Sequence, residues 1–308
     1  MPGKVAFLFP GQGSQYVGMA RDLYEHSPAA RERLETLQEA VGFPLLAVMF
    51  EGPEEVLTAT ENAQPAILSH SLAVLAAWEE RGDCPRACAV AGHSLGEYSA
   101  LVAAGALAPE DAVRLVRVRG ELMARVGEKR PGSMAAVIGM EAEALAQVLA
   151  GITEGTVVIA NHNCPGQLVI SGDPPAVQAA AKAAKAAGAK SIIPLRVSGA
   201  FHSPLMQPSA EEFAAHLATV PFWDAQVPVY CNTDAAPHTA AEELRQAALR
   251  QLTGPVLWQN SVERMAADGV EEFIEVGPKE VLTNLVKRIL PGAKARAVSS
   301  WHQLAAET

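Results

Sequence analysis

The amino-acid sequence predicts an α/β protein in which a mainly parallel sheet carries helices on both faces and a smaller subdomain is inserted into the chain. Short apolar runs with the length of buried strands alternate with longer helical runs near both ends of the chain. Between residues 133 and 197 the order changes to β-α-β-β-α-β. The chain has 308 residues, 49% of them hydrophobic and 19% charged, which supplies enough apolar material for a large core and a second unit.

The N-terminal part supplies the first strand and the first long helices. Residues 5–9 are an apolar strand that enters the loop 10–15 (Pro-Gly-Gln-Gly-Ser-Gln), which has too many glycines to extend it. Because the loop lacks the Gly-Lys-Ser/Thr ending of a P-loop, nucleotide binding is not expected there. Ser27 and Pro28 are typical of the start of a helix, and residues 63–78 form a second helix.

A serine lies on a tight turn between the next strand and helix. The apolar run 88–91 is followed by residues 92–96 (Gly-His-Ser-Leu-Gly) and then by the helix-prone run 97–104. In this context Ser94 has the setting of a nucleophile elbow, with its hydroxyl exposed beside the free N–H groups of the helix. The G-x-S-x-G pattern is common by itself, so a structural helix N-cap is the alternative. The strand and helix on either side favour a nucleophile.

The helix expected at residues 109–126 contains a charge on its apolar side. The residues three and four positions before and after Arg119 are all apolar, so its guanidinium is predicted to point inward. A buried guanidinium needs an anionic partner. The partner is either a structural carboxylate or a ligand anion, and the pattern alone favours the structural carboxylate.

Six elements make up the inserted subdomain. The sequence predicts strands at 134–139, 157–161, 167–171 and 191–197 and helices at 141–149 and 174–187. This order is that of the ferredoxin-like split motif. We therefore expect a core of residues 1–131 and 199–308 and an insertion of residues 132–198, with the second crossing at Ser198 and Gly199.

A histidine follows the insertion directly. Alternation resumes with strands expected at 227–231 and 272–276 and helices at 240–252, 261–267 and 281–289. His202 lies on the irregular segment before these elements, where a cleft between the two units is expected. Ser209 and Glu212 have the spacing of a capping box that would open the next helix. Histidine is the usual general base for a serine, although a buried structural histidine fits the same pattern.

Charge and cysteine content exclude several functions. With 24 Lys and Arg against 34 Asp and Glu, the net charge of -10 opposes binding to nucleic acid or to an anionic membrane. The apolar run before Pro10 is too short for a signal peptide or a membrane span, so a cytoplasmic protein is expected. The four cysteines form no C-x-x-C pair and no metal-like group with the histidines. Neither a metal nor a cofactor is expected.

Together these motifs resemble the malonyl-CoA:acyl carrier protein transacylases of fatty acid synthesis. The resemblance is carried by residues 9–15, 92–98, Arg119 and 199–202, and it extends over essentially the whole chain. It includes further short segments, namely Asn161 with residues 165–167, 232–233, 251–252 with Pro255, and 275–278. The family's fold, an α/β-hydrolase-like core with a ferredoxin-like insertion, agrees with the fold expected from the residues.

The resemblance implies a role for each matching residue. Ser94 would attack the thioester of malonyl-CoA, and His202 would take its proton. The backbone N–H groups of Gln12 and Leu95 would bind the oxyanion. Arg119 would grip the malonyl carboxylate through a bidentate contact. The malonyl group would then pass from Ser94 to the phosphopantetheine thiol of acyl carrier protein in a ping-pong reaction, so malonyl-CoA and acyl carrier protein are the expected partners.

Three further residues complete the implied site. In the family a backbone carbonyl near the position of Gln251 orients the histidine, and Gln251 is also expected at the substrate site. Phe201 matches the malonyl-selecting form of its motif, because it limits the room beside the α-carbon. Asn161 is expected to bind substrate.

Acyl carrier proteins are acidic, so a basic landing surface is needed on this acidic chain. The candidates are the basic residues of the insertion and of the last predicted helix: Lys182, Lys185, Lys190, Arg196, Lys287 and Arg288. Ordinary solvated charges are an equally good interpretation of them. Two other functions remain open from the residues: a serine thioesterase or esterase, against which the inward Arg119 argues, and a carrier-docking scaffold without chemistry.

Overall fold

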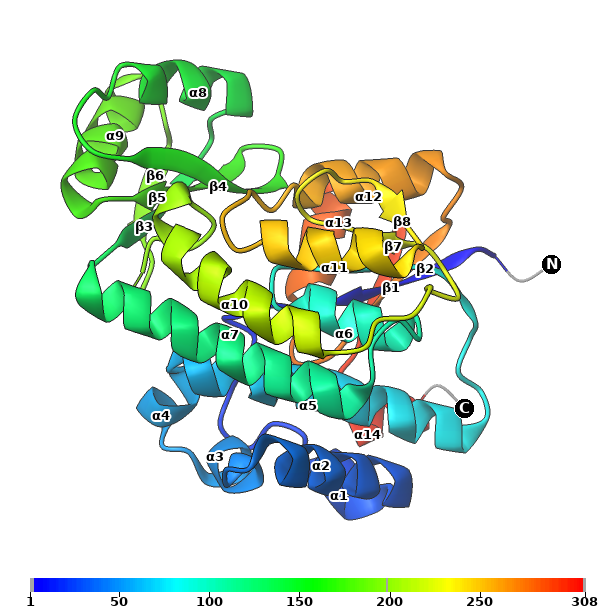
Figure 1. Ribbon diagram of the computed structural model, residues 1–308. Coiled ribbons are helices and arrows are strands. Elements are labelled where there is room, and N and C mark those ends of the chain that lie inside the picture. The colour runs from blue at the N-terminus through cyan, green and yellow to red at the C-terminus, as the bar shows by residue number, and fades with distance from the viewer. Residues whose placement is uncertain (1–2, 198, 307–308) are drawn as a thin grey trace.

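The computed structural model describes residues 3–197 and 199–306, and two β-sheets organise them (Figure 1). Sheet A has six strands within these residues, in the order β10 (Lys294–Val298), β9 (Glu272–Val276), β1 (Val5–Phe9), β2 (Ala87–Gly92), β7 (Val229–Tyr230) and β8 (Pro237–His238). All neighbouring strands are parallel except β7 and β8. The predicted mainly parallel core is confirmed, with β8 and β10 as edge strands that were not predicted.

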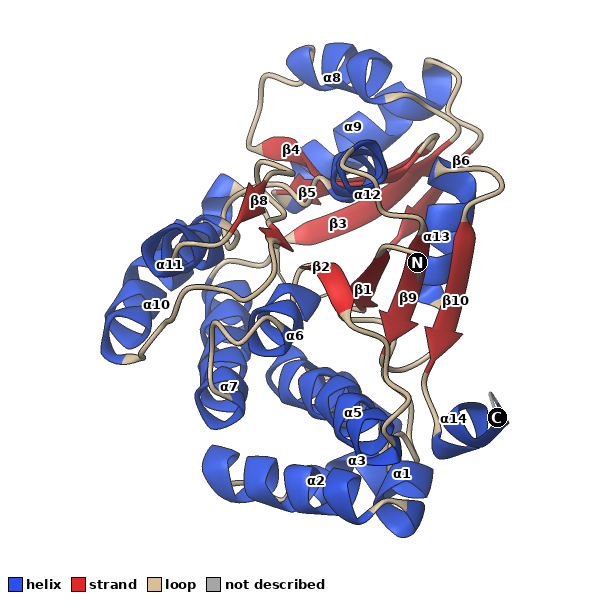
Figure 2. Ribbon diagram, turned by 90° about the vertical axis from the view of Figure 1, so that its right-hand side faces the viewer, coloured by secondary structure: helices blue, strands red, loops and turns tan. Residues whose placement is uncertain are grey.

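Helices cover both faces of sheet A (Figure 2). Side chains alternate along β1, so that Phe7 and Phe9 join one apolar cluster while Ala6 and Leu8 join the other. The first cluster packs against the larger set of helices: α1 (Arg21–His26), α2 (Pro28–Val41), α3 (Leu45–Glu51), α4 (Glu54–Thr58), α5 (Thr60–Arg81), α6 (Gly96–Ala103), α7 (Pro109–Lys129), α10 (Gln207–Thr219), α11 (Ala241–Arg250) and α14 (Trp301–Ala306). The second packs against α12 (Trp258–Ala267) and α13 (Val281–Ile289).

Sheet B is antiparallel and lies between α7 and α10 in the chain. Its strand order is β4 (Val157–Cys164), β5 (Gln167–Gly172), β3 (Ser133–Ile138) and β6 (Ser191–Pro194). The helices α8 (Ala142–Ala150) and α9 (Pro174–Ala186) cover one face. The other face packs against Met123 on α7 and against Phe201 and Met206. The predicted βαββαβ order is therefore confirmed, and one face of this sheet is turned toward the core.

Two strands are shorter than predicted. β6 ends at Pro194 rather than at Val197. Leu195 N still donates to Met134 O at 2.9 Å, but Val197 N then turns back to Leu195 O at 3.1 Å, so the chain leaves the extended conformation. β7 pairs with β2 over two residues only, so it ends one residue before Cys231. Ser198, predicted in the second crossing, lies outside the described residues.

The predicted capping box at Ser209 is wrong. Helix α10 begins at Gln207, so Ser209 lies inside it, and its hydroxyl donates to Leu122 O at 3.1 Å. The start of this segment is instead the 3₁₀ turn η1 (Pro204–Met206), where Ser203 Oγ accepts a hydrogen bond from Leu205 N at 3.3 Å. The S-x-x-E spacing was misleading because prolines already suit the first turns of both elements.

None of the helices in the described ranges combines the length and the apolar character that a membrane span requires. Those ranges also contain no group of three or more His, Cys, Asp or Glu side chains arranged to hold a metal ion. All four cysteines are free.

Candidate active site

Ser94 lies on the turn between β2 and α6, beside the middle of sheet A. Its φ of 52° falls in the left-handed region, which costs a non-glycine residue about 1–3 kcal/mol and persists only where the surroundings enforce it. Gly96 permits the turn, because a Cβ at this position would lie 2.0 Å from the backbone oxygen of Phe9. The strand, the strained serine and the helix together have the geometry of a nucleophile elbow.

The glycine-rich loop after β1 packs against this elbow. A Cβ on Gly11 would lie 2.3 Å from the backbone oxygen of His93, so only glycine permits the approach. The close contact brings Gln12, from the loop, and Leu95, from the elbow, to the same cavity as Ser94. The two residues predicted to bind the oxyanion therefore lie together beside the nucleophile.

His202 contacts the nucleophile directly. The Ser94 hydroxyl lies 2.7 Å from His202 Nε2. On the other side of the ring, Nδ1 lies 2.9 Å from Gln251 O and 3.2 Å from Gly254 O. Because carbonyl oxygens can only accept, Nδ1 carries the proton and Nε2 is left to accept from the serine. Two backbone carbonyls thus fill the orienting role that a carboxylate has in a Ser-His-Asp triad.

The environment keeps His202 neutral. Burial is the main cause that lowers its pKa, the charge of Arg119 lowers it further, and the carbonyls of Gln251 and Gly254 partly oppose them, so that the pKa is about 3. At neutral pH the imidazole is therefore unprotonated. It can accept the serine proton without first losing one of its own.

Arg119 reaches the nucleophile from α7 and is only 1% exposed. Its guanidinium donates to Gln64 Oε1 at 2.8 Å, to Gln251 Oε1 at 3.0 Å and to Ser94 Oγ at 3.2 Å. No carboxylate in the described ranges lies within ion-pair distance of it. The pattern alone favoured a structural carboxylate; the structure supplies neutral amides and a hydroxyl instead. The charge is left available for a ligand anion beside Ser94.

Two side chains on α5 connect Arg119 to the first loop. Gln64, which accepts from Arg119, donates through Nε2 to Thr60 Oγ1 at 3.1 Å. Thr60 in turn donates to Gln12 Oε1 at 2.9 Å. No role was predicted for Gln64 from the sequence. The feature of the sequence that could have indicated a role is that Gln64 is a polar residue on a helix that is buried on nearly all sides.

Seven of the eight predicted site residues line one cavity of about 430 Å³: Gln12, Ser94, Leu95, Arg119, Asn161, Phe201 and His202. Asn161 Oδ1 is buried and has no hydrogen-bond partner among the described residues, so it is free to accept from a ligand. Gln251 is fully buried and does not line the cavity. It contacts the residues that do, through its carbonyl, its amide oxygen and its amide nitrogen.

Two asparagines were not predicted at the site. Asn163 lines the cavity, and its Oδ1 lies 2.9 Å from His93 Nε2, so His93 bonds to Asn163 rather than to Ser94. Asn232 follows β7 and accepts a hydrogen bond from the backbone N–H of Ser94 at 2.8 Å. It stood in a segment that carried the family resemblance, but its spacing in the sequence gave it no role.

Comparison with known proteins identifies the family of this chain. The acyl transferase domain model matches residues 6–304, so the chain belongs to the acyl transferase domain family and is an acyltransferase. The malonyl CoA-acyl carrier protein transacylase of Bacillus subtilis (strain 168) is 49% identical over 298 residues, which are 96% of this chain and 93% of the relative. That of Escherichia coli (strain K12) is 45% identical over 98% of this chain and 97% of its own. The predicted resemblance to these transacylases is confirmed.

Solved structures show the same fold. An acyl carrier protein S-malonyltransferase from Vibrio cholerae superposes with a TM-score of 0.95 at 42% identity and covers 99% of this chain and 100% of its own. A malonyl-transacylase solved in complex with a type II PKS acyl-carrier protein has a TM-score of 0.95 at 40% identity and covers 98% of both chains.

Proposed function

We propose that this enzyme transfers the malonyl group from malonyl-CoA to the phosphopantetheine thiol of acyl carrier protein, through an ester on Ser94. The observation that carries the proposal is the buried Arg119, which has only neutral hydrogen-bond partners and lies 3.2 Å from the Ser94 hydroxyl. An acyl group that ends in a carboxylate would pair with it while its carbonyl carbon meets the serine.

Acylation begins when the Ser94 oxygen attacks the thioester carbonyl and His202 Nε2 takes the serine proton. The developing oxyanion is bound by the backbone N–H groups of Gln12 and Leu95. Collapse of the tetrahedral intermediate breaks the carbon–sulfur bond. The CoA sulfur leaves with the proton from His202, and malonyl remains as an ester on Ser94.

The second half reverses these roles. The carrier thiol gives its proton to His202 and attacks the ester carbonyl, and Ser94 leaves with the proton restored. Phe201, next to His202, limits the space beside the α-carbon of the acyl group. Asn161 offers its unpartnered oxygen to the substrate.

Labelled malonyl-CoA, with and without phosphopantetheinylated carrier, tests this reaction. We expect a malonyl adduct on Ser94 in intact mass spectra, and its transfer to the carrier at a rate well above that of hydrolysis. Free malonate released as fast as carrier is loaded would instead identify a thioesterase. Absence of any adduct would point to a docking scaffold. Ser94→Ala, which removes the nucleophile, should abolish adduct and transfer alike.

The organisation of the chain supports the same proposal. We place the catalytic core at residues 1–131 and 199–308 and an inserted unit at 132–198, because sheet B has an apolar cluster of its own with α8 and α9. The cavity with Ser94 is lined by residues from both units.

CoA thioesters and carrier proteins meet in the cytoplasm, where we place the enzyme.

A further inference from the structure

Asn232 bonds to the elbow on both sides of the nucleophile. Its Oδ1 accepts from Ser94 N at 2.8 Å, and its Nδ2 donates to Gly92 O at 2.7 Å. The side chain is fully buried and does not line the substrate cavity. One side-chain amide thus fixes the backbone at Gly92 and at Ser94. A serine in the left-handed region requires such a constraint from its surroundings.

The same amide holds Gln251. Gln251 Nε2 donates to Asn232 Oδ1 at 3.2 Å and to Ser94 O at 3.0 Å. Gln251 in turn accepts from His202 through its backbone carbonyl and from Arg119 through its side chain. Asn232 therefore bonds directly to Ser94, and it is linked to His202 and to Arg119 through one intermediate residue, Gln251.

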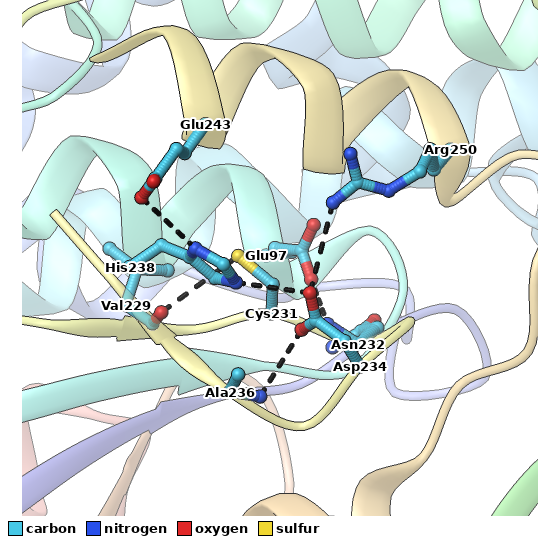
Figure 3. A network of polar contacts seen from close by, with 9 residues as sticks. All are labelled: Glu97, Val229, Cys231, Asn232, Asp234, Ala236, His238, Glu243 and Arg250. Carbon is cyan, nitrogen blue, oxygen red and sulfur yellow. Dashed lines mark hydrogen bonds and ion pairs between the residues drawn. The ribbon is translucent and has the colours of Figure 1, made fainter. Parts of the chain in front are cut away.

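Glu97 supports Asn232 from the first turn of α6. Its Oε2 accepts from Asn232 N at 2.6 Å, and Figure 3 shows its side chain reaching toward Asn232. The carboxyl is 1% exposed and belongs to no cavity that includes Ser94. Burial raises its pKa to about 7, and the Asn232 N–H partly opposes this. A buried carboxyl on the helix that follows the elbow is therefore used to hold the loop after β7.

A second set of contacts holds that loop from outside. Asp234 lies 3.0 Å from His238 Nε2 and 3.7 Å from Arg250, the residue before Gln251 (Figure 3). His238 also lies 3.2 Å from Glu243 on α11. The loop with Asn232 and the end of α11 with Gln251 are thus fastened to each other as well as to the elbow.

We propose that Asn232, held by Glu97, is a positioning residue that keeps Ser94 and His202 in register for acyl transfer. The proposal rests on the proposed function of Ser94. Because neither residue reaches the cavity, their loss should slow the chemical step and leave substrate binding nearly unchanged. A displacement of about 1 Å at a reacting group can reduce a rate roughly 100-fold.

Asn232→Ala tests the proposal in the full-length enzyme with malonyl-CoA. We expect acylation of Ser94, measured by quenched-flow and intact mass spectrometry, to slow by about 100-fold while KM for malonyl-CoA changes by less than about threefold. Tyr230→Phe is the matched control, because Tyr230 lies only two residues before Asn232, at the end of β7, and its hydroxyl bonds at 2.7 Å to Asp268 rather than to the elbow. Its acylation rate should stay near that of the wild type.

Glu97 variants separate positioning from a general loss of structure. Glu97→Gln keeps an oxygen for Asn232 N and should retain most of the acylation rate, whereas Glu97→Ala should fall toward Asn232→Ala. The double variant Glu97→Ala with Asn232→Ala should be little slower than Asn232→Ala alone, because both changes disable one unit. Fully additive losses, or a folded Asn232→Ala with a wild-type acylation rate, would overturn the proposal. If Asn232→Ala does not fold, the two Glu97 variants decide.

A fluorophosphonate that labels activated serines keeps this test distinct from that of the proposed function. Its reaction with Ser94 needs the elbow and His202 but no malonyl group. If the wild type forms no malonyl ester, the proposed function fails, and the labelling rates still decide about positioning. Labelling of Asn232→Ala at the wild-type rate would refute the role of Asn232, and labelling slowed about 100-fold would support it.

Discussion

At the scale of single residues, we propose that Arg119 determines which acyl groups fit. Its guanidinium meets Gln64, Gln251 and Ser94, which are all neutral, at 2.8 to 3.2 Å. A malonyl carboxylate adds the missing negative charge, whereas an acetyl group leaves the buried cation uncompensated. Breaking a buried ion pair by removing one partner costs about 3–5 kcal/mol, enough for a selectivity of 100-fold or more.

Arg119→Ala should therefore reverse the acyl preference. We expect kcat/KM for malonyl-CoA to fall by about 100-fold or more, while that for acetyl-CoA stays the same or rises because no cation remains to be buried. Competition between the two thioesters for carrier loading measures the ratio directly. A ratio equal to that of the wild type would contradict the carboxylate contact.

The loss of kcat/KM at acid pH should begin at an unusually low pH. The pKa of His202 is lowered to about 3, first by burial and then by Arg119, so the imidazole stays neutral from pH 8 down to pH 5. We expect kcat/KM for acylation to change little over this range. A histidine with the ordinary pKa near 6.5 would be mostly protonated at pH 5 and would lose about 30-fold in rate. A decline with a midpoint near 6.5 would contradict the neutral buried base.

The role of a single residue could be predicted where the residues that define its surroundings are close to it in the sequence. Ser94 stands in a local strand-turn-helix pattern, and Arg119 stands within an apolar stripe on its own helix. Asn232 could not be predicted in the same way, since it acts on Ser94 across 138 residues. The neutral surroundings of Arg119 also depend on Gln64 and Gln251, which the helix pattern does not reveal.

At the scale of elements, a buried carboxylate holds the start of α13. Glu275 on β9 accepts from Leu282 N at 3.0 Å and from Thr283 N at 2.7 Å. These are N–H groups of the first turn, which have no partner within the helix. The same turn lines the cavity with Val281 and Leu282. The cap therefore fixes one wall of the active site as well as the helix.

Glu275→Gln should weaken this cap. A glutamine offers one oxygen and one NH₂ group to two N–H donors, so one donor is left unsatisfied in the interior. We expect the free energy of unfolding to fall by about 1–3 kcal/mol, measured by urea denaturation. Asn284→Ala on the exposed side of the same helix is the control and should change it by much less. Equal losses in the two variants would contradict the capping role.

Elements with a strong burial pattern could be predicted, and edge elements could not. The insertion strands and the long helices lie within a few residues of their predicted positions. β10 was missed because only Val298 of its five residues is fully buried, so its sequence lacks a buried-strand pattern. β8 has two residues and no apolar alternation. Tertiary contacts rather than local sequence define both strands.

At the scale of the whole molecule, sheet B separates two groups of basic residues. Lys182 and Lys185 lie on α9, which covers the face of sheet B turned away from α7 and Phe201. Arg196 follows β6, is exposed, and lines the cavity that contains Ser94. The basic surface expected from the sequence therefore consists of at least two separate parts. Of its six candidate residues, Arg196 lines the cavity and Arg288 hydrogen-bonds to Gln167, which also lines it, whereas Lys182 and Lys185 lie on the far side of sheet B.

This separation predicts where charge affects catalysis. CoA phosphates and an acidic carrier are both anionic, so Arg196→Glu should raise KM for malonyl-CoA and for the carrier by about 10-fold at low salt, and less at high salt where the charges are screened. Lys182→Glu makes the same change in net charge on the far side of sheet B and should leave both KM values nearly unchanged. Steady-state kinetics of both variants at two salt concentrations would measure this. If the two variants raise KM equally, the net charge of -10 rather than the position of the charge governs binding of CoA and carrier. Only a long-range electrostatic field has the same effect whichever side of the molecule carries the changed charge.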